Sequence, residues 1–431
     1  MRIITLFFFH GHNIHCTIYR MFDQYPHFDM SRRIMRMHLR PLIWLLCMPA
    51  LIAHRNRLEK IDMEGIKPPY LLLCNHNAFM DFKVATKATF PHRVNYVVAI
   101  DGYLKREWLL RLIGCICKRK FTRDATLVRQ LREVARRGDI PAIYPEARYS
   151  LCGTTAVMPA SVGKLAKFLK IPVVTLICHG HHINSPFWNL HDRKVKGTEA
   201  TMKCLYTAEQ LAAATPDEIY RRITEEFSYD DYDWQKRKNI KVTYPKRAEG
   251  LHKVLYQCPA CMTEYRMASH DDILQCSSCG KKWRMGEDGQ LSATDGVTEF
   301  SHIPHWYEWQ RSNVRKEVQD GTYSFRCTAH VDILPKDRYI HIGKATLVHD
   351  MEGFTLRGSH DGSPYEVRWP ASELYSCHIE YDYLGKYGDC VDLNTLTDTF
   401  YIYPEDCDFS VTKLALATEE LYQHLNGGSV G

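Results

Sequence analysis

The residues Asn75-His76, with Asp81 five positions after the histidine, form the first set in this chain whose types and spacing could carry out chemistry. They follow the apolar run 71–74, so a buried strand would carry His76 to the carboxyl edge of a sheet, where open α/β folds bind ligands. Asp81 would lie about one helical turn further on and accept a hydrogen bond from the ring. That bond would fix the tautomer and leave the other nitrogen able to take a proton from a hydroxyl group. A core histidine that is merely satisfied by a nearby carboxylate is the alternative.

The chemistry of such a base depends on what the hydroxyl oxygen would attack. The sequence places no nucleophilic serine or cysteine motif beside His76. The electrophile would therefore have to be activated before it binds, because the protein would form no covalent intermediate with it. A thioester meets that requirement.

Three later segments give this histidine a context: KRKFTRD at 118–124, YPEARYS at 144–150 and KIPVVTLICHG at 170–180. Together with the first segment they resemble the four ordered blocks of the glycerolipid acyltransferase family, the PlsC-like enzymes that acylate lysophosphatidate. The resemblance covers roughly two-fifths of the chain, from about residue 55 to about residue 225. The positions that match the blocks are, in chain order, Asn75, His76, Asp81, Phe121, Arg123, Asp124, Glu146, Arg148, Ser150 and Pro172.

The resemblance implies a role for each central residue. His76 is expected as the general base and Asp81 as the residue that orients it. Arg123 and Arg148 are expected to bind the acceptor's phosphate, for which a planar guanidinium is well shaped, and Glu146 to organise that subsite. The implied reaction moves a fatty acyl group from acyl-CoA or an acyl-carrier-protein thioester to the hydroxyl of a lysophospholipid, in phospholipid biosynthesis.

Basic residues precede the second block. Lys118, Arg119 and Lys120 would either form a positive rim that attracts anionic lipid head groups or lie on an ordinary solvated surface.

Two positions of the third block depart from the family pattern, which is often written E-G-T-R-S and in some branches E-G-R-x-S. Ala147 stands where the pattern has glycine, and alanine adopts a positive φ less readily. Tyr149 stands where the commoner pattern has arginine. Both departures leave the head group of the acceptor open, so acylation of a non-phosphate acceptor such as an amino-lipid or an ether lipid is an alternative.

Four cysteines form a second motif, with fourteen residues between two CxxC pairs. Two such pairs at this separation place four thiolates around one tetrahedral Zn²⁺ with no position left for a substrate, as in a zinc ribbon or rubredoxin-like module. Iron is an alternative metal, since tetrahedral sulfur sites accept it. The predicted metal ligands of this structural site are Cys258, Cys261, Cys276 and Cys279.

The composition is that of a globular protein with several domains. The chain has 431 residues, of which 45% are hydrophobic, and a formal net charge of +6. Its sixteen cysteines do not resemble a secreted disulfide framework, which indicates a reducing, cytoplasmic setting. Basic residues beside the four cysteines are few, so no nucleic-acid partner is expected.

The amino-terminal region could contact a membrane without crossing it. No apolar stretch reaches the roughly 18 residues that a spanning helix needs. The nearest, residues 41–53, contains Pro49 and has arginines on both sides. It would be either a buried helix pair or an interfacial segment on anionic lipid. With the expected lipid substrate, the second interpretation places the protein peripherally at the inner face of the cell membrane.

The elements that must position these residues alternate between strand and helix. Apolar strands are expected at 69–76, 93–100, 140–146 and 172–180, with helices between them, which indicates an α/β fold with a mixed, largely parallel sheet. The segment FSYDDYDWQKRKN reads as a tether or a surface extension. Strands and one closing helix end the chain, with a loose topological resemblance to a pleckstrin-homology fold. The expected domains are a membrane-associating segment (1–60), an acyltransferase domain (61–230), a zinc ribbon (250–290) and a β-rich domain (323–427).

A different class of function is also open. The protein could be a zinc-ribbon adaptor that binds nucleic acid or protein, with an acyltransferase-like domain that is inactive. The intact His76 and Asp81 pair with basic residues around it favours the enzyme.

Overall fold

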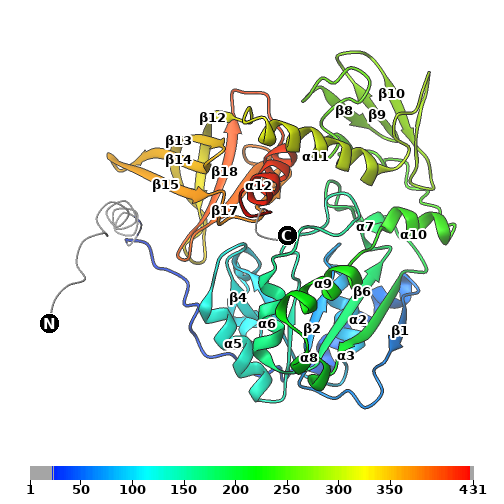
Figure 1. Ribbon diagram of the computed structural model, residues 1–431, viewed down its shortest axis with the longest axis vertical. Helices are drawn as coiled ribbons and strands as arrows, with labels where there is room; N and C mark the ends of the chain where they lie inside the picture. Colours follow the sequence, from blue (N-terminus) through cyan, green and yellow to red (C-terminus); the bar gives the residue numbers. More distant parts are fainter. Residues whose placement is uncertain (1–21, 23, 428–431) are drawn as a thin grey trace. The chain divides into compact units, whose positions relative to one another are not determined.

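The computed structural model describes residue 22 and residues 24–427 of the chain (Figure 1). These residues form two units. The α/β unit comprises residues 30–118 and 123–312; the β-rich unit comprises residues 119–122 and 313–427 together with the described residues before Met30. Most of the first 23 residues of the expected membrane-associating segment lie outside the described part.

A seven-stranded mixed sheet forms the centre of the α/β unit, in the spatial order β1-β7-β6-β2-β5-β3-β4. The five strands from β6 to β4 are parallel, and β7 is antiparallel to β6 and parallel to β1. The expected largely parallel sheet is therefore confirmed. Its strands are β1 (Arg57–Ile61), β2 (Leu71–Cys74), β3 (Val94–Ala99), β4 (Ile116–Lys118), β5 (Ile140–Ile143), β6 (Val173–His179) and β7 (Glu199–Tyr206).

Helices cover both faces of this sheet. Alternate apolar residues of β2, β5 and β6 pack against three helices in one core cluster: α5 (Ala125–Arg136), α6 (Ser161–Leu169) and α9 (Pro216–Glu226). Near the opposite face, α3 (Met80–Thr89) packs on Tyr96 of β3 and on α2 (Arg40–Ala53). The shorter helices of the unit are α4 (Glu107–Leu112), α7 (His181–Asn184), α8 (Ala208–Ala213) and α10 (Asp231–Arg237).

The segment 227–239 is part of the α/β unit, and its interpretation as a tether is wrong. Asp230 caps α10 by accepting hydrogen bonds from the backbone of Tyr232 and Asp233. The side chains of Tyr232 and Trp234 are fully buried. These two aromatic residues anchor the segment despite its charged composition.

A small antiparallel sheet follows, in the order β11-β10-β9-β8, and holds the four cysteines. Its strands are β8 (Met267–His270), β9 (Ile273–Cys276), β10 (Lys282–Met285) and β11 (Leu291–Ala293). The buried rings of Trp283 and Trp306 pack edge to face and connect this sheet to helix α11 (Ile303–Gln319). The side chain of Gln310 in α11 also bonds the backbone of Val254 and Gln257.

The β-rich unit is a seven-stranded antiparallel sheet, in the order β15-β14-β13-β12-β18-β17-β16, with one closing helix. The helix is α12 (Val411–Asn426), whose residues from Val411 to Leu421 are buried almost without interruption. This is the expected β-rich carboxyl-terminal fold. Its strands are β12 (Phe325–Ile333), β13 (Ile340–Asp350), β14 (Gly353–His360), β15 (Ser363–Pro370), β16 (His378–Glu380), β17 (Cys390–Asn394) and β18 (Thr399–Glu405).

Candidate active site

His76 lies just beyond the carboxyl end of the central strand β2. Its side chain is 23% exposed, so the ring is held by the protein and still reaches the surface. The ring stacks on Tyr144 at 4.1 Å between centroids and meets Tyr149 at 4.3 Å. Its backbone N–H donates to Glu146 Oε1 at 3.0 Å, and its carbonyl accepts from Ser150. Residues of the third block therefore surround the histidine on several sides.

Asp81 stands in the first turn of α3 and is fully buried. Its Oδ2 atom accepts the backbone N–H groups of Asn77 at 2.6 Å and Ala78 at 2.9 Å. The same oxygen lies 3.4 Å from His76 Nδ1, an ion-pair distance that is longer than a strong hydrogen bond. The structure thus brings the expected pair together, with the aspartate beneath the ring.

A second imidazole contacts Asp81, and the sequence reasoning did not find it. His181, at the start of α7, has its Nδ1 atom 2.5 Å from Asp81 Oδ1 and is 1% exposed. Burial by itself would raise the pKa of the Asp81 carboxyl, but the hydrogen bonds from His181 and His76 lower it to about 2. Asp81 is therefore a carboxylate between two histidines. The only signal in the sequence is the histidine-rich run CHGHH after the fourth strand.

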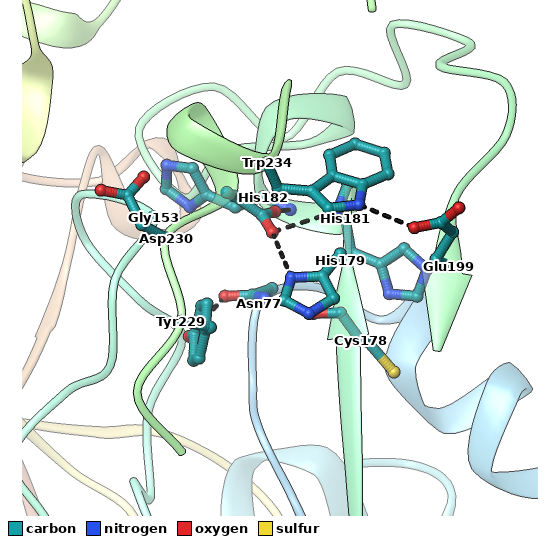
Figure 2. A network of polar contacts seen from close by, with 12 residues as sticks. Asn77, Gly153, Cys178, His179, His181, His182, Glu199, Tyr229, Asp230 and Trp234 are labelled. Atoms are coloured by element: carbon teal, nitrogen blue, oxygen red, sulfur yellow. Dashed lines mark hydrogen bonds and ion pairs between the residues drawn. The ribbon is translucent and has the colours of Figure 1, made fainter. Parts of the chain in front are cut away.

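Neighbouring asparagines fasten β2 to β6 at this edge of the sheet. The Asn75 amide donates to the carbonyl of Cys178 at 2.9 Å and its oxygen accepts the Cys178 N–H at 2.8 Å. The Asn77 oxygen accepts from the hydroxyl of Tyr229 at 2.8 Å, and Figure 2 shows these two residues together with Cys178 and His181. Both contacts fix the turn that presents His76.

Asp231 holds the short helix α7 through backbone hydrogen bonds at its amino-terminal end. It is fully buried, and its carboxylate accepts the backbone N–H of Gly180 at 3.1 Å and of His182 at 2.9 Å. Gly180 has φ +87°, and a Cβ there would lie 2.8 Å from the Trp234 ring, so no larger residue fits. Trp234 in turn donates to Glu199 of β7, as the dashed line in Figure 2 shows.

Glu146 joins the third block to His76 from a fully buried position. Its second oxygen accepts the backbone N–H of Ala156 at 2.8 Å. Burial raises the pKa of the Glu146 carboxyl to about 8, although the backbone hydrogen bonds and the nearby charge of Arg148 act in the opposite direction. Ala147 does adopt the left-handed conformation, with φ +56°, that its position requires.

The two arginines of the predicted phosphate subsite differ in exposure. Arg148 is 4% exposed and lies close enough to Glu146 for its charge to lower that residue's pKa. Arg123 is exposed, at the start of α5. Within the described part of the chain, no hydrogen bond or ion pair joins Arg123 to His76, Asp81 or Glu146.

The basic residues before the second block are not a free positive rim. Arg119 is buried, and its guanidinium donates to the carbonyls of Leu334 and Pro335 and to Thr399 Oγ1. Lys120 pairs with the buried Asp392 at 3.1 Å. Both residues belong to the β-rich unit.

The four predicted metal ligands converge. Their sulfur atoms lie within 4.8 Å of one another, and the pairs Cys258–Cys279 and Cys261–Cys276 are each separated by 3.8 Å. Four sulfurs placed about 2.3 Å from a tetrahedral zinc would be about 3.8 Å apart. Both CxxC turns have the same form, since the residue after each second cysteine has a positive φ and donates to the carbonyl of the first. The donor set therefore fits a tetrahedral metal ion.

Comparison with known proteins identifies the part of the chain that carries His76. Residues 53–179 match the family model described as Acyltransferase. These residues are an acyltransferase domain. The matched segment contains the first three blocks and all but the last residue of the fourth, and it ends at the last residue of β6.

A search of solved structures gives a weaker likeness. The 1-acyl-sn-glycerophosphate (LPA) acyltransferase PlsC from Thermotoga maritima matches with 15% sequence identity and a TM-score of 0.36, over 46% of this chain and 80% of that one. No curated protein sequence matches the chain. Among the described residues, no helix has the length and apolar character needed to cross a membrane.

Proposed function

We propose that the acyltransferase domain moves a fatty acyl group from a CoA or acyl-carrier-protein thioester to the hydroxyl of a lysophospholipid, in phospholipid biosynthesis. The observation that supports this most directly is the partly exposed His76 ring above the buried Asp81 carboxylate. The histidine is reachable by a substrate, and the aspartate is held in its ionised form by its hydrogen-bond donors.

The side chains at this site can carry the proton through the reaction. His76 takes the proton of the acceptor hydroxyl as that oxygen attacks the thioester carbonyl, and Asp81 stabilises the resulting imidazolium. The tetrahedral intermediate then collapses, the carbon–sulfur bond breaks, and the thiolate receives the proton from His76. The histidine returns to its starting state.

The acceptor subsite is assigned to Arg123, Arg148 and Glu146. The guanidinium groups would bind a phosphate, as the family resemblance implies. The buried Arg148 sits within the electrostatic reach of Glu146 and the exposed Arg123 faces solvent, which suits an inner and an outer contact. A non-phosphate acceptor is the second candidate, favoured by Tyr149, whose ring lies against His76 where the commoner pattern has arginine.

The membrane face is assigned to helix α2. Its residues Leu42, Leu45, Leu46 and Ile52 are between 49% and 69% exposed, an apolar surface unusual for a solvated helix. Arginines lie on both sides of this helix in the sequence. An anionic bilayer would cover the leucines and attract the arginines, which fits a peripheral protein at the inner face of the cell membrane.

The cysteine module is assigned a structural Zn²⁺ held by Cys258, Cys261, Cys276 and Cys279. A closed four-thiolate site would stabilise the fold of a sheet whose strands have only three or four residues. Domain limits are proposed as in the sequence analysis, with the acyltransferase domain extended from residue 230 to Arg237 because α10 packs on it.

The test is acyl transfer by the purified protein to mixed lysophospholipids with acyl-CoA as donor, with products identified by mass spectrometry. The His76→Ala variant should lose transfer and keep the circular-dichroism spectrum of the wild type. His191→Ala, which removes an exposed histidine, is the matched control and should keep full activity. Full activity in the His76 variant would defeat the assignment, and salt-dependent binding of nucleic acid by an inactive wild type would favour the adaptor.

A further inference from the structure

Asp81 uses its two oxygens for two different partners. Oδ2 receives two backbone N–H groups and faces His76, whereas among the described residues Oδ1 receives only the ring of His181. If the His181 bond were absent, Oδ1 would be a buried carboxylate oxygen with no donor, which is costly. His181 therefore fixes the Oδ1 side of a carboxylate whose Oδ2 side is held by the two backbone N–H groups, and it helps to keep the carboxylate ionised.

The position of His181 is itself fixed independently of Asp81. Asp231 accepts the N–H groups of the residues immediately before and after His181, and both acidic side chains are fully buried. Asp231 is held in place because its own N–H donates to the Gly153 carbonyl. The ring of His181 is thus delivered to Asp81 by a braced turn, not by a mobile loop.

We propose that His181 is a positioning residue for acyl transfer: its Nδ1–H holds Asp81 Oδ1 so that Oδ2 faces the His76 ring. This inference rests on the proposed function of His76. His181 does not touch the substrate, because its side chain is only 1% exposed. It acts through Asp81 by keeping the carboxylate ionised and correctly turned when His76 gains its proton.

The other titratable groups near Asp81 do not replace this role. Burial raises the pKa of two thiols and two phenols that feel the Asp81 charge well above their usual values, so they stay neutral; these are Cys74, Cys178, Tyr144 and Tyr229. Burial likewise raises the pKa of Glu146 to about 8, so that group affects the alkaline side of a pH profile. Among the described residues, the imidazoles of His76 and His181 are the side chains that approach the Asp81 carboxylate within ion-pair distance.

Two outcomes follow for His181→Phe, which removes the donor and puts a somewhat larger aromatic ring in its place, and a third follows for His181→Asn. The kcat should fall about 10- to 100-fold, as for other residues that orient a catalytic group, with unchanged KM values for donor and acceptor. The acidic limb of the kcat profile should move to higher pH, because the Asp81 carboxyl holds its proton more tightly once the hydrogen bond from His181 is lost. His181→Asn, whose amide N–H occupies the place of Nδ1, should regain most of the lost kcat.

The matched control is His182→Asn on the same turn. Burial lowers the pKa of His182 to about 4, so its ring is neutral at neutral pH, and it packs against Trp188 and Tyr232. This variant should lose stability and leave the pH profile in place. If His181→Phe behaves in the same way, with wild-type kcat and pH limbs, His181 is only structural and the proposal is overturned.

A measurement that does not depend on activity separates this inference from the proposed function. In ¹⁵N-histidine NMR spectra of the wild-type protein, Nδ1 of His181 should carry a proton, and the resonance of this proton should lie far downfield. The same resonance should be absent from the spectrum of Asp81→Asn. An unprotonated Nδ1 would overturn the proposal. A protonated Nδ1 in a protein that transfers no acyl group would leave the contact intact and defeat the proposed function instead.

Discussion

Replacing Asp81 by asparagine should change how the stability of the sheet edge depends on pH. In the folded protein the pKa of the Asp81 carboxyl is lowered from 3.8 to about 2. A depressed carboxyl pKa adds stability above the unfolded value, and this contribution is lost as the pH falls through the folded value. At 1.36 kcal/mol per pKa unit it amounts to about 2 kcal/mol at pH 6.

The size of the effect at an accessible pH follows from the same two values. Between pH 6 and pH 3 the ionised Asp81 should lose about 1 kcal/mol of its contribution, which is roughly a 6-fold change in an opening equilibrium. The asparagine variant has no such group. The stability advantage of the wild type over Asp81→Asn should therefore shrink by this amount on acidification.

Hydrogen exchange followed by mass spectrometry suits this test because it reports β2 and β6 separately from the cysteine module and the β-rich unit. The ratio of protection factors, wild type over Asp81→Asn, should be about 6-fold smaller at pH 3 than at pH 6 in peptides that cover these two strands. The control is Asp295→Asn, an exposed position in the turn after β11, whose ratio should stay near one. A ratio for Asp81 that is the same at both pH values would refute the charge assignment.

Three other predictions concern separate parts of the chain. Ala147→Gly should raise the free energy of unfolding by up to about 1 kcal/mol in thermal melts, since glycine tolerates φ +56°; a lower midpoint would contradict this. Elemental analysis should find one zinc per chain. Cys258→Ser should lose the zinc, and its residues 254–301 should become sensitive to proteolysis. A Cys258→Ser protein that still holds one zinc per chain would argue against the four-thiolate site. Arg148→Ala should raise the KM for a phosphate-bearing acceptor about 10- to 100-fold, with little change in the KM for the donor. The control is Arg129→Ala on the exposed face of α5, which should leave the acceptor KM unchanged. The same acceptor KM in both variants would remove Arg148 from the subsite.

Local signals predicted the framework of the acyltransferase domain well. The expected apolar strands at 69–76, 93–100, 140–146 and 172–180 placed β2, β3, β5 and β6 within a few residues. The motif around His76 and Asp81 is also local, because one strand end and one helix turn bring the two side chains together. The strands and the His76–Asp81 pair could be predicted because the residues that form each of them are close in the sequence.

The rest of the site depends on contacts between distant segments. His181 reaches Asp81 only because β6 is the neighbour of β2 in the sheet. The order of the strands cannot be predicted from any single segment of the sequence. Asp231 reaches α7 only because the chain returns after α9. The charges of the segment 227–239 outweighed its aromatic residues in the sequence reasoning, although Asp230 is a typical helix cap and Trp234 a typical core residue.

The same segment gives the cysteine module a physical connection to the proposed catalytic residues. His302, which follows β11, bonds Asp230 at 2.7 Å, and the Gln235 amide of α10 donates to the carbonyl of Glu287 at 3.0 Å. Asp231, next to Asp230, fixes the turn that carries His181. A metal ion that folds the module therefore also restrains α10, and through it the imidazole that orients Asp81. We expect metal loss to lower kcat through this path even though no cysteine of the module touches the reacting atoms.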